Sequence, residues 1–282
     1  MKNLLTLFVL LLTITSCATK LKFPKEEASA LKLCFLGDVG KATKAQFLVA
    51  QALKEEKCHQ IFFLGDIIYP NGISDPADPR FVSRFWSYYQ DLPKMDNRPS
   101  LNIILGNHDH VTNPNAWLQI SREIPKIYFP HHHYWQKIKD ICLVALDSNR
   151  KNYDEQIEWL KTERPKWKEC RYLVAMAHHP LFTNGPNHPT SLPVLKEFYD
   201  NHVIGKFDFL IVGHEHIVEY LGTIKGTELF VSGAGGALAR GYKPGYMTIE
   251  KMTEKEGEAL TIKLKTIEKD GEVKIRPYTK AN

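Results

Sequence analysis

Five short polar segments punctuate this chain, and each follows directly on a short apolar run. They read Gly37-Asp38-Val39-Gly40, Gly65-Asp66-Ile67-Ile68-Tyr69, Gly106-Asn107-His108-Asp109-His110, His178-His179-Pro180 and Gly213-His214-Glu215-His216. The apolar runs have the length and composition of buried β-strands. Because ligands in open α/β sheets gather at the carboxyl ends of the strands, the pattern predicts an α/β protein with one site at a sheet edge.

Seven side chains in these segments are potential metal ligands. They are two carboxylates, a phenol, an amide and three imidazoles, contributed by Asp38, Asp66, Tyr69, Asn107, His178, His214 and His216. This mixture of oxygen and nitrogen donors suits two neighbouring hard or borderline cations better than one. A single Gly-Asp pair is typical of a turn, so the prediction depends on all five segments occurring together.

The five segments, in this order, resemble the motifs of calcineurin-like metallophosphoesterases. Within that superfamily they are most similar to the small, tartrate-resistant type of purple acid phosphatase, which has a Tyr three residues after the second Asp, as at Tyr69. The likeness extends over residues 30–240 and includes Val231-Ser232-Gly233-Ala234-Gly235. It implies a four-layer αββα sandwich of two mixed sheets flanked by helices.

The residue pattern agrees with that α/β fold. Strand-like runs over residues 31–36, 61–64, 101–105, 141–147, 173–177 and 209–212 alternate with helical patterns over 43–55, 80–90, 153–163 and 193–201. Beyond residue 217, strand-like runs dominate, over residues 217–221, 228–232, 246–250, 259–266 and 273–278. We expect the aromatic cluster over residues 81–89 to pack into the core and the charged stretch over residues 250–258 to be a solvated turn.

The resemblance also implies a role for each ligand. Asp66 bridges two metals roughly 3.5–4 Å apart, because a carboxylate has two oxygens. The remaining six divide between the metals as follows: Asp38, Tyr69 and His216 for one, and Asn107, His178 and His214 for the other. In an extended segment, side chains two residues apart point to the same side, which would let the last two histidines serve one metal each.

Tyr69 is the residue that selects the metal. A free phenol has a pKa near ~10 and binds a divalent ion poorly at neutral pH, whereas trivalent iron displaces the proton. The expected cofactor is a dinuclear centre of Fe(III) and a divalent ion, which is iron, zinc or manganese. With a phenolate, two carboxylates and a bridging hydroxide, this centre keeps a charge of roughly +1 and attracts a phosphate dianion.

These parts predict a metal-dependent acid phosphatase that hydrolyses phosphomonoesters by in-line attack of a metal-bound hydroxide. The departing oxygen needs a proton, which His108 or His110 can donate, and the resemblance favours His108. One alternative is a phosphodiesterase or nucleotidase of the same superfamily, which Tyr69 argues against. Another is a surface lipoprotein that binds phosphate or a partner and catalyses nothing, which the presence of His108 argues against.

Several neighbouring residues have open roles. Ala175 occupies the position, three residues before the fourth-segment His, where the family usually has Val. The loop after the fourth segment lacks a His that close relatives have there and that contacts the phosphate, and His188 or Asn184 could make this contact instead. Asp109 could orient a ligand imidazole. The remaining histidines of interest are His179, which either faces the cleft or caps its strand, and His131, His132 and His133, which we interpret as a solvated loop.

Residues 1–17 have the features of a targeting segment. Lys2 precedes an apolar stretch over residues 4–14, which is shorter than the ~20 residues needed to span a bilayer. Ile14-Thr15-Ser16-Cys17 resembles a bacterial lipoprotein processing site, with an ordinary secretory signal as the alternative. We therefore expect a polar tether over residues 18–30, a single domain over residues 31–282, and an exported protein, periplasmic or on the cell surface, anchored to a bacterial membrane by lipid on Cys17.

Charge and cysteines bound the remaining possibilities. The net charge is +5 and no long basic stretch occurs, so we expect a small phosphorylated substrate, no nucleic acid, and a monomer. Cys34 and Cys142 lie inside apolar strands and are expected to be buried thiols. Cys58 and Cys170 lie just ahead of strands, where a bridge is possible, and the sequence leaves the pairing open.

Overall fold

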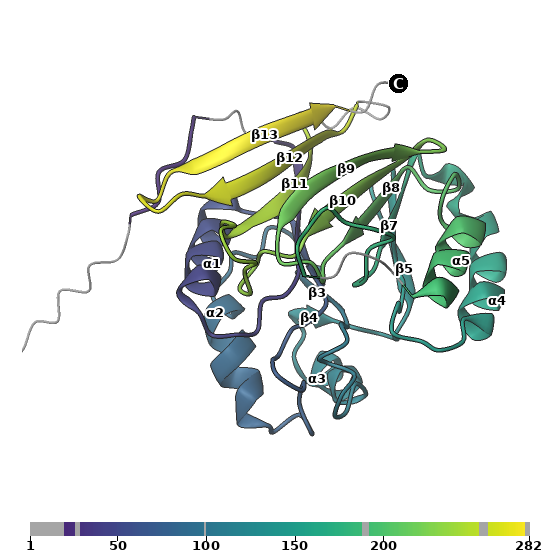
Figure 1. Ribbon diagram of the computed structural model, residues 1–282, viewed down its shortest axis with the longest axis horizontal. Helices are drawn as coiled ribbons and strands as arrows, with labels where there is room; N and C mark the ends of the chain where they lie inside the picture. The colour runs from purple at the N-terminus through teal and green to yellow at the C-terminus, as the bar shows by residue number, and fades with distance from the viewer. Residues whose placement is uncertain (1–19, 26–28, 99, 188–191, 254–258, 280–282) are drawn as a thin grey trace, which may run out of the picture.

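Two mixed β-sheets pack face to face, and helices cover their outer faces (Figure 1). The structure is a computed structural model that describes residues 20–25, 29–98, 100–187, 192–253 and 259–279. The first sheet has seven strands in the order β13-β12-β11-β1-β2-β3-β4, and the second has six in the order β5-β6-β7-β8-β10-β9. The predicted four-layer αββα sandwich is confirmed.

The bounds of the elements are as follows. The first sheet contains β1 (Leu31–Leu36), β2 (Gln60–Leu64), β3 (Leu101–Ile104), β4 (Ile127–Tyr128), β11 (Gly245–Lys251), β12 (Thr261–Ile267) and β13 (Val273–Thr279). The second contains β5 (Tyr134–Ile138), β6 (Ile141–Ala145), β7 (Tyr172–Met176), β8 (Phe209–Val212), β9 (Val218–Ile224) and β10 (Thr227–Ser232). The helices are α1 (Lys44–Glu56), the π-helical turn η1 (Phe81–Trp86), α2 (Ser87–Tyr89), α3 (Ala116–Glu123), α4 (Asp154–Glu163), the 3-10 turn η2 (Arg164–Glu169) and α5 (Pro193–His202).

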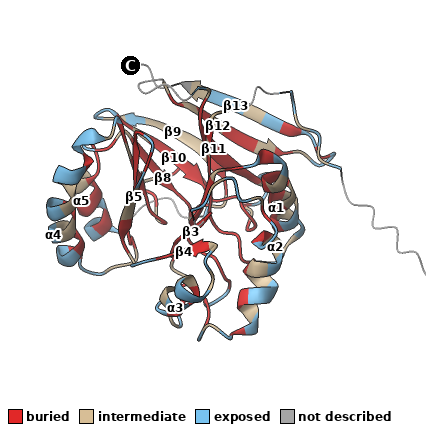
Figure 2. Ribbon diagram, turned by 180° about the vertical axis from the view of Figure 1, so that it is seen from behind, coloured by how far each residue is buried: buried red, intermediate tan, exposed pale blue. Residues whose placement is uncertain are grey.

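Parallel strands form the centre of each sheet. The strands β1, β2, β3 and β4 pair in parallel in the first sheet, and β6, β7, β8 and β10 do so in the second. Helices α1 and α2 lie against the first sheet, and α4 and α5 lie against the second (Figures 1 and 2). The carboxyl ends of the parallel strands therefore line up along one edge of each sheet.

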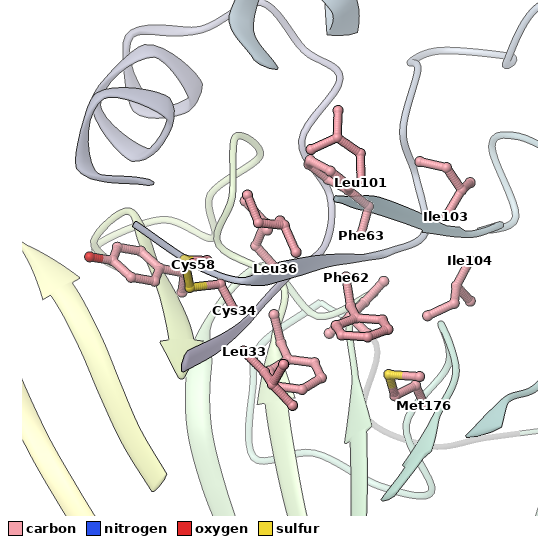
Figure 3. Packing of buried hydrophobic residues seen from close by; sticks show 14 of the residues in the cluster. Leu33, Cys34, Leu36, Cys58, Phe62, Phe63, Leu101, Ile103, Ile104 and Met176 are labelled. Atoms are coloured by element: carbon pink, nitrogen blue, oxygen red, sulfur yellow. A yellow bond between two sulfur atoms is a disulfide. The ribbon is translucent and has the colours of Figure 1, made fainter. Parts of the chain in front are cut away.

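Side-chain alternation along the central strands builds two apolar layers (Figure 3). Leu33, Phe62 and Met176 point into the space between the sheets, whereas Leu36 and Phe63 point toward the helices. All five are fully buried, and burial of each such side chain contributes roughly 1.5–3 kcal/mol. The sequences of the parallel strands are continuous apolar runs because both faces of each strand are covered.

The predicted elements are correct in the parallel core and incomplete at the periphery. The helix expected over residues 80–90 is a π-helical turn followed by the short α2, and its Phe81, Phe85 and Tyr89 side chains are buried as expected. Four elements are missing from the prediction: β4, β5, α3 and η2. Strand β5 escapes prediction because its sequence YWQKI mixes buried and partly exposed residues without a clean alternation.

Two disulfides show that the prediction of buried thiols was wrong. Cys34 of β1 pairs with Cys58, and Cys142 of β6 pairs with Cys170, across Cα–Cα distances of 5.9 and 5.7 Å. Each bridge joins a strand to the residue just ahead of the next parallel strand, because the returning chain arrives beside its predecessor. The closed loops span 24 and 28 residues, and each closure stabilises the fold by roughly 3–4 kcal/mol in the chain-entropy model.

The described residues of the segment expected to be a tether contact the first sheet, at Lys22 and at Ser29, whose hydroxyl donates to Glu250 at 2.7 Å. The Lys22 N–H donates to the Gly271 carbonyl at 2.8 Å, and the Val273 N–H donates to the Lys22 carbonyl at 2.9 Å. Residues 1–19 and 26–28, which include Cys17, lie outside the described residues, so the signal and tether predictions stay predictions. In the described part of the chain, no helix is both long and apolar enough to cross a membrane.

The stretch expected to be a solvated turn begins with buried charges instead. Glu250 and Lys251 end strand β11 and are each 1% exposed. Glu250 accepts a hydrogen bond from Lys263 at 2.9 Å, and Lys251 donates to Asp140 of the second sheet's β5–β6 turn at 2.8 Å. The prediction was wrong for Glu250 and Lys251, because strand β11, which pairs with β1 and β12, extends through both residues. Residues 254–258 lie outside the described residues, so that part stays a prediction.

A buried ionic network ties the end of α1 to the first sheet. Glu56 accepts hydrogen bonds from Lys32 at 2.7 Å, from Tyr246 at 2.7 Å and from Lys265 at 2.6 Å. The side chains of Lys265 and Glu56 are 0% and 2% exposed. Because each charge is removed from water, loss of any one partner leaves another buried charge without compensation and destabilises the fold.

We predict that Glu56→Gln lowers the free energy of unfolding by about 3–5 kcal/mol, because it leaves the buried Lys265 ammonium without its closest anion. The matched control is Glu158→Gln, which breaks an exposed pair with Lys161 and should change stability by less than about 1 kcal/mol. Urea denaturation of both variants measures the difference. Equal losses in the two variants would contradict the assigned role of Glu56.

Candidate metal centre

The carboxyl ends of strands β1, β2, β3, β7 and β8 converge where the two sheets meet. Each predicted ligand segment begins within three residues of its strand end, and both sheets contribute. The structure brings all seven predicted ligands into one place: Asp38, Asp66 and Asn107 after strands of the first sheet, His178, His214 and His216 after strands of the second, and Tyr69 from the turn after β2.

Tight turns at the strand ends place these side chains. Asp38, Asp66 and His214 have φ values of 60°, 53° and 68°, in the left-handed region that residues other than glycine seldom adopt. Each such residue costs roughly 1–3 kcal/mol and persists only where its surroundings fix it. A Cβ atom at Gly106 would overlap the Asp66 carboxylate, and one at Gly65 would overlap the His178 ring, so the glycines are required by the ligands.

The same geometry corrects one expectation. The segment from His214 to His216 was expected to be extended, with both imidazoles on one side. The left-handed φ of His214 shows that the chain turns there instead. Glu215 does point away from the site, and it accepts a hydrogen bond from the Asn187 N–H at 3.2 Å.

One group of ligand atoms surrounds His178. Its Nε2 lies 3.0 Å from Asn107 Oδ1, 3.1 Å from His214 Nδ1 and 3.4 Å from Asp66 Oδ1. Ligand atoms held ~2.0–2.2 Å from one ion lie roughly 3–3.5 Å from each other. The spacing of these four atoms therefore suits a shared cation.

A second group surrounds Tyr69. Its hydroxyl lies 3.1 Å from Asp38 Oδ1 and 3.2 Å from His216 Nε2, and these two atoms lie 3.5 Å apart. The two groups correspond to the two sets implied by the family resemblance. Asp66 belongs to the first group and also interacts with Tyr69, so it lies where a bridging carboxylate would be needed.

Hydrogen bonds outside the ligand groups orient the ligands. The Nδ1–H of His178 donates to the Leu64 carbonyl at 2.8 Å, which leaves the Nε2 lone pair directed into the site. The His214 N–H donates to Asp38 Oδ2 at 2.8 Å, and the His108 N–H donates to Asp66 Oδ1 at 3.0 Å. Both carboxylates are therefore fixed by backbone amides.

Asp109 holds the turns rather than an imidazole. It accepts hydrogen bonds from the N–H groups of Gly106 at 2.9 Å, Ile67 at 3.0 Å and Ile68 at 3.2 Å. Burial, together with the charge of Asp66, raises the pKa of Asp109 to about 7. The side chain thus connects the turn after β2 to the turn after β3, and its hydrogen bonds are to these backbone amides rather than to a ligand imidazole.

The electrostatics of the site fit cations. Asp38 and Asp66 are 0% and 2% exposed, and among the described residues their ion pairs are with histidines alone. Burial and the charges of these carboxylates raise the pKa of Tyr69 far above its ordinary value. Burial lowers the pKa of His178, but the charges of Asp66, Asp38 and Asp109 and the hydrogen bond to the Leu64 carbonyl together outweigh burial and raise it. Two buried anions that pair with imidazoles but with no lysine or arginine among the described residues favour a bound cation, and the donors match hard and borderline metals.

A cavity of about 470 Å³ opens over the ligand groups and is lined in addition by Lys41, Arg84 and His108. Lys41 Nζ lies 4.7 Å from the centre of the Tyr69 ring. Nδ1 of His108 hydrogen-bonds to the Pro70 carbonyl, and its Nε2 lies 3.8 Å from Asp66 Oδ2. Sequence reasoning missed the two basic residues, although Lys41 directly follows the first polar segment.

A second cavity of about 740 Å³ adjoins the first and shares Asn107 and His214 with it. His110 lines this second cavity, with its Nε2 3.4 Å from Asp147 Oδ1. His179 also lines it, and its Nδ1 forms a hydrogen bond with the Ser148 hydroxyl at 2.9 Å. Sequence reasoning missed Asp147, whose signal is its position two residues after β6, matching Asp38 after β1.

The remaining predictions concern the three histidines before β5 and the residues proposed for a phosphate contact. His132 and His133 are not solvated, because their side chains are largely buried and the His133 ring packs 4.7 Å from Trp159. Asn184 donates a hydrogen bond to Glu219 at 2.9 Å instead of facing the ligands. His188 lies outside the described residues.

Comparisons with known proteins agree with this site. Residues 31–218 match the family described as calcineurin-like phosphoesterase. Tartrate-resistant acid phosphatase type 5 of Sus scrofa is 26% identical over 240 residues, which are 73% of this chain and 69% of the relative. Purple acid phosphatase 7 of Arabidopsis thaliana is 25% identical over 270 residues, 79% of this chain and 76% of the relative.

Two solved structures share the fold. Purple acid phosphatase PPD1 from yellow lupin (Lupinus luteus) has a TM-score of 0.61 at 13% identity, covering 86% of this chain and 52% of that one. GAP50, the anchor in the inner membrane complex of Plasmodium, has a TM-score of 0.65 at 16% identity, covering 90% of each chain. Since the family match spans more than half of the sequence and agrees with the observed architecture, this chain belongs to the calcineurin-like phosphoesterase family.

Proposed function

We propose that this chain is a metal-dependent acid phosphatase that hydrolyses phosphomonoesters at a dinuclear centre of Fe(III) and a divalent iron, zinc or manganese ion. The observation that carries the proposal is the position of the Tyr69 hydroxyl, 3.1 Å from Asp38 and 3.2 Å from His216. Family membership supports a phosphoesterase, and relatives named as acid phosphatases support the phosphomonoester class.

The residues divide between holding metals and handling substrate. The Tyr69 group and the His178 group would hold one metal each, with Asp66 between them. When bound, the metal pair supplies positive charge to the phosphoryl group and lowers the pKa of the attacking water. A cavity of about 470 Å³ suits a small phosphorylated substrate, and Lys41 and Arg84 on its wall attract the phosphate dianion.

His108 is the proposed donor of the proton to the leaving oxygen. Nδ1 hydrogen-bonds to the Pro70 carbonyl, which leaves Nε2 to carry the transferable proton when the ring is protonated. The ring lines the same cavity as the ligand groups. We assign the step to His108 rather than to His110, because His110 faces the second cavity beside Asp147.

The proposal is tested by comparing hydrolysis of p-nitrophenyl phosphate and its bis ester across pH. We expect monoester hydrolysis with an acidic optimum, and Asp66→Ala should lower kcat by more than ~100-fold, since even outer-shell partners of a metal are worth 10–100-fold. Elemental analysis of that variant should show lost metal. Asp91→Ala, at an exposed carboxylate, is the matched control and should keep both metal and activity.

The outcomes separate the alternatives. Faster hydrolysis of the bis ester would identify a phosphodiesterase. Retention of two metals with no hydrolysis of either ester would identify a protein that only binds. An active Asp66→Ala variant with two metals would refute the bridging assignment.

We further predict that the protein is purple or pink from charge transfer between the Tyr69 phenolate and Fe(III), and that Tyr69→Phe abolishes the visible band. The band requires the phenol oxygen, which the substitution removes while it keeps the ring. Tyr242→Phe, at an exposed tyrosine, should retain the colour. A colourless, zinc-only enzyme with full activity would rule out the iron assignment.

We also propose that the protein is exported and anchored by lipid on Cys17. The two disulfides support export, because disulfides persist in oxidising compartments. Cys17→Ala should prevent incorporation of labelled fatty acid and release the protein from the membrane fraction. Unchanged lipid labelling of this variant would exclude the anchor.

A further inference from the structure

We propose a third metal site, for Zn²⁺, formed by His110, which lines the second cavity, together with His132 and Asp147. The three ligand atoms lie within 4.8 Å of one another. They come from the turn after β3, the segment before β5 and the turn after β6. The proposal does not depend on the phosphatase activity, because it concerns residues outside the seven ligands of the dinuclear centre.

The spacing of the ligand atoms is compatible with a cation shared among the three residues. His110 Nε2 lies 3.4 Å from Asp147 Oδ1, and His132 Nδ1 lies 3.9 Å from Asp147 Oδ2. Hydrogen bonds of this kind measure about 2.7–2.9 Å. Ligands roughly 2.0–2.2 Å from a tetrahedral zinc ion lie about 3.3–3.5 Å apart, so a small movement of His132 would complete the coordination.

The two nitrogens that face Asp147 are buried and have no hydrogen-bond partner among the described residues. The other nitrogen of His132, Nε2, hydrogen-bonds to Asn115 Oδ1 at 2.9 Å. An amide oxygen only accepts, so Nε2 carries the proton and Nδ1 presents a lone pair toward the carboxylate. A lone pair that faces an anion is stabilised by a cation between them.

Asp147 is held in place for this role. The Asn149 N–H donates to Oδ1 at 3.0 Å, and Arg150 Nε donates to Oδ2 at 2.9 Å. Its side chain is 2% exposed, against 21% for His110 and 10% for His132. Fixed carboxylates and oriented imidazoles are typical surroundings of metal ligands.

The composition of the site favours zinc with an open position. Two imidazoles and one carboxylate are a common set for zinc ions that keep a fourth position for water or substrate. His110 lines the second cavity, which shares Asn107 and His214 with the dinuclear centre. A cation held by these residues would lie beside this cavity, where it adds attraction for an anionic part of the substrate.

The test is zinc-edge anomalous diffraction and elemental analysis of protein that has a filled dinuclear centre and has received one further equivalent of Zn²⁺. We expect three metal ions per chain, with one anomalous peak between His110, His132 and Asp147. His132→Ala should lose that peak and one equivalent of metal while it keeps the other two. The control His131→Ala changes an exposed neighbour and should keep three.

Two results would overturn the proposal. One is wild-type protein with two filled sites and no peak at the third, which needs no variant and is independent of folding defects. The other is a folded His132→Ala variant that still binds three ions. Loss of the dinuclear metals with retention of the third peak would count against the proposed function and leave the third site intact.

Discussion

The rest of the structure depends on two carboxylates, Asp38 and Asp66, that are buried without a lysine or arginine beside them. Their burial removes hydration that no basic side chain replaces, so the metal-free site carries excess negative charge. The backbone amides of His108 and His214 stabilise the carboxylates in part. Burial and the same charges explain why the pKa of the Tyr69 phenol is raised far above its ordinary value.

This constraint explains the unusual backbone around the site. Left-handed φ values at Asp38, Asp66 and His214 cost free energy, and they place ligand atoms at separations that suit shared cations. Gly65 and Gly106 leave the space that the ligands occupy. The strained turns at the ligands therefore lower the stability of the fold locally. Burial of the apolar layers between and outside the two sheets offsets this loss.

The sequence was sufficient to predict the parallel core and the seven clustered ligands, because both depend on short, local patterns. Apolar runs define β1, β2 and β8 with few errors, and each ligand follows its strand end at a fixed spacing. The family resemblance also anticipated the division of the ligands into the Tyr69 and His178 groups. It did not anticipate that His214 would reach its place through a turn rather than an extended segment.

What the sequence could not show depends on distant residues meeting. The partner of Cys34 is fixed by where the returning chain meets its preceding strand, and the partner of Lys251 is fixed by how the two sheets stack. Asp109 contacts backbone amides of two turns, and His132 approaches Asp147 from the loop before β5. No local pattern encodes such pairings, since they follow from tertiary packing.

The ligands span the chain from Asp38 to His216, with both sheets contributing. A nascent or truncated chain that ends before residue 216 lacks part of the donor set, and a fragment with only one sheet has at most four of the seven donors. The full set of donors is therefore assembled only late in synthesis and folding of the chain. The identity of the bound ions will reflect the metal supply of whichever compartment completes the folding.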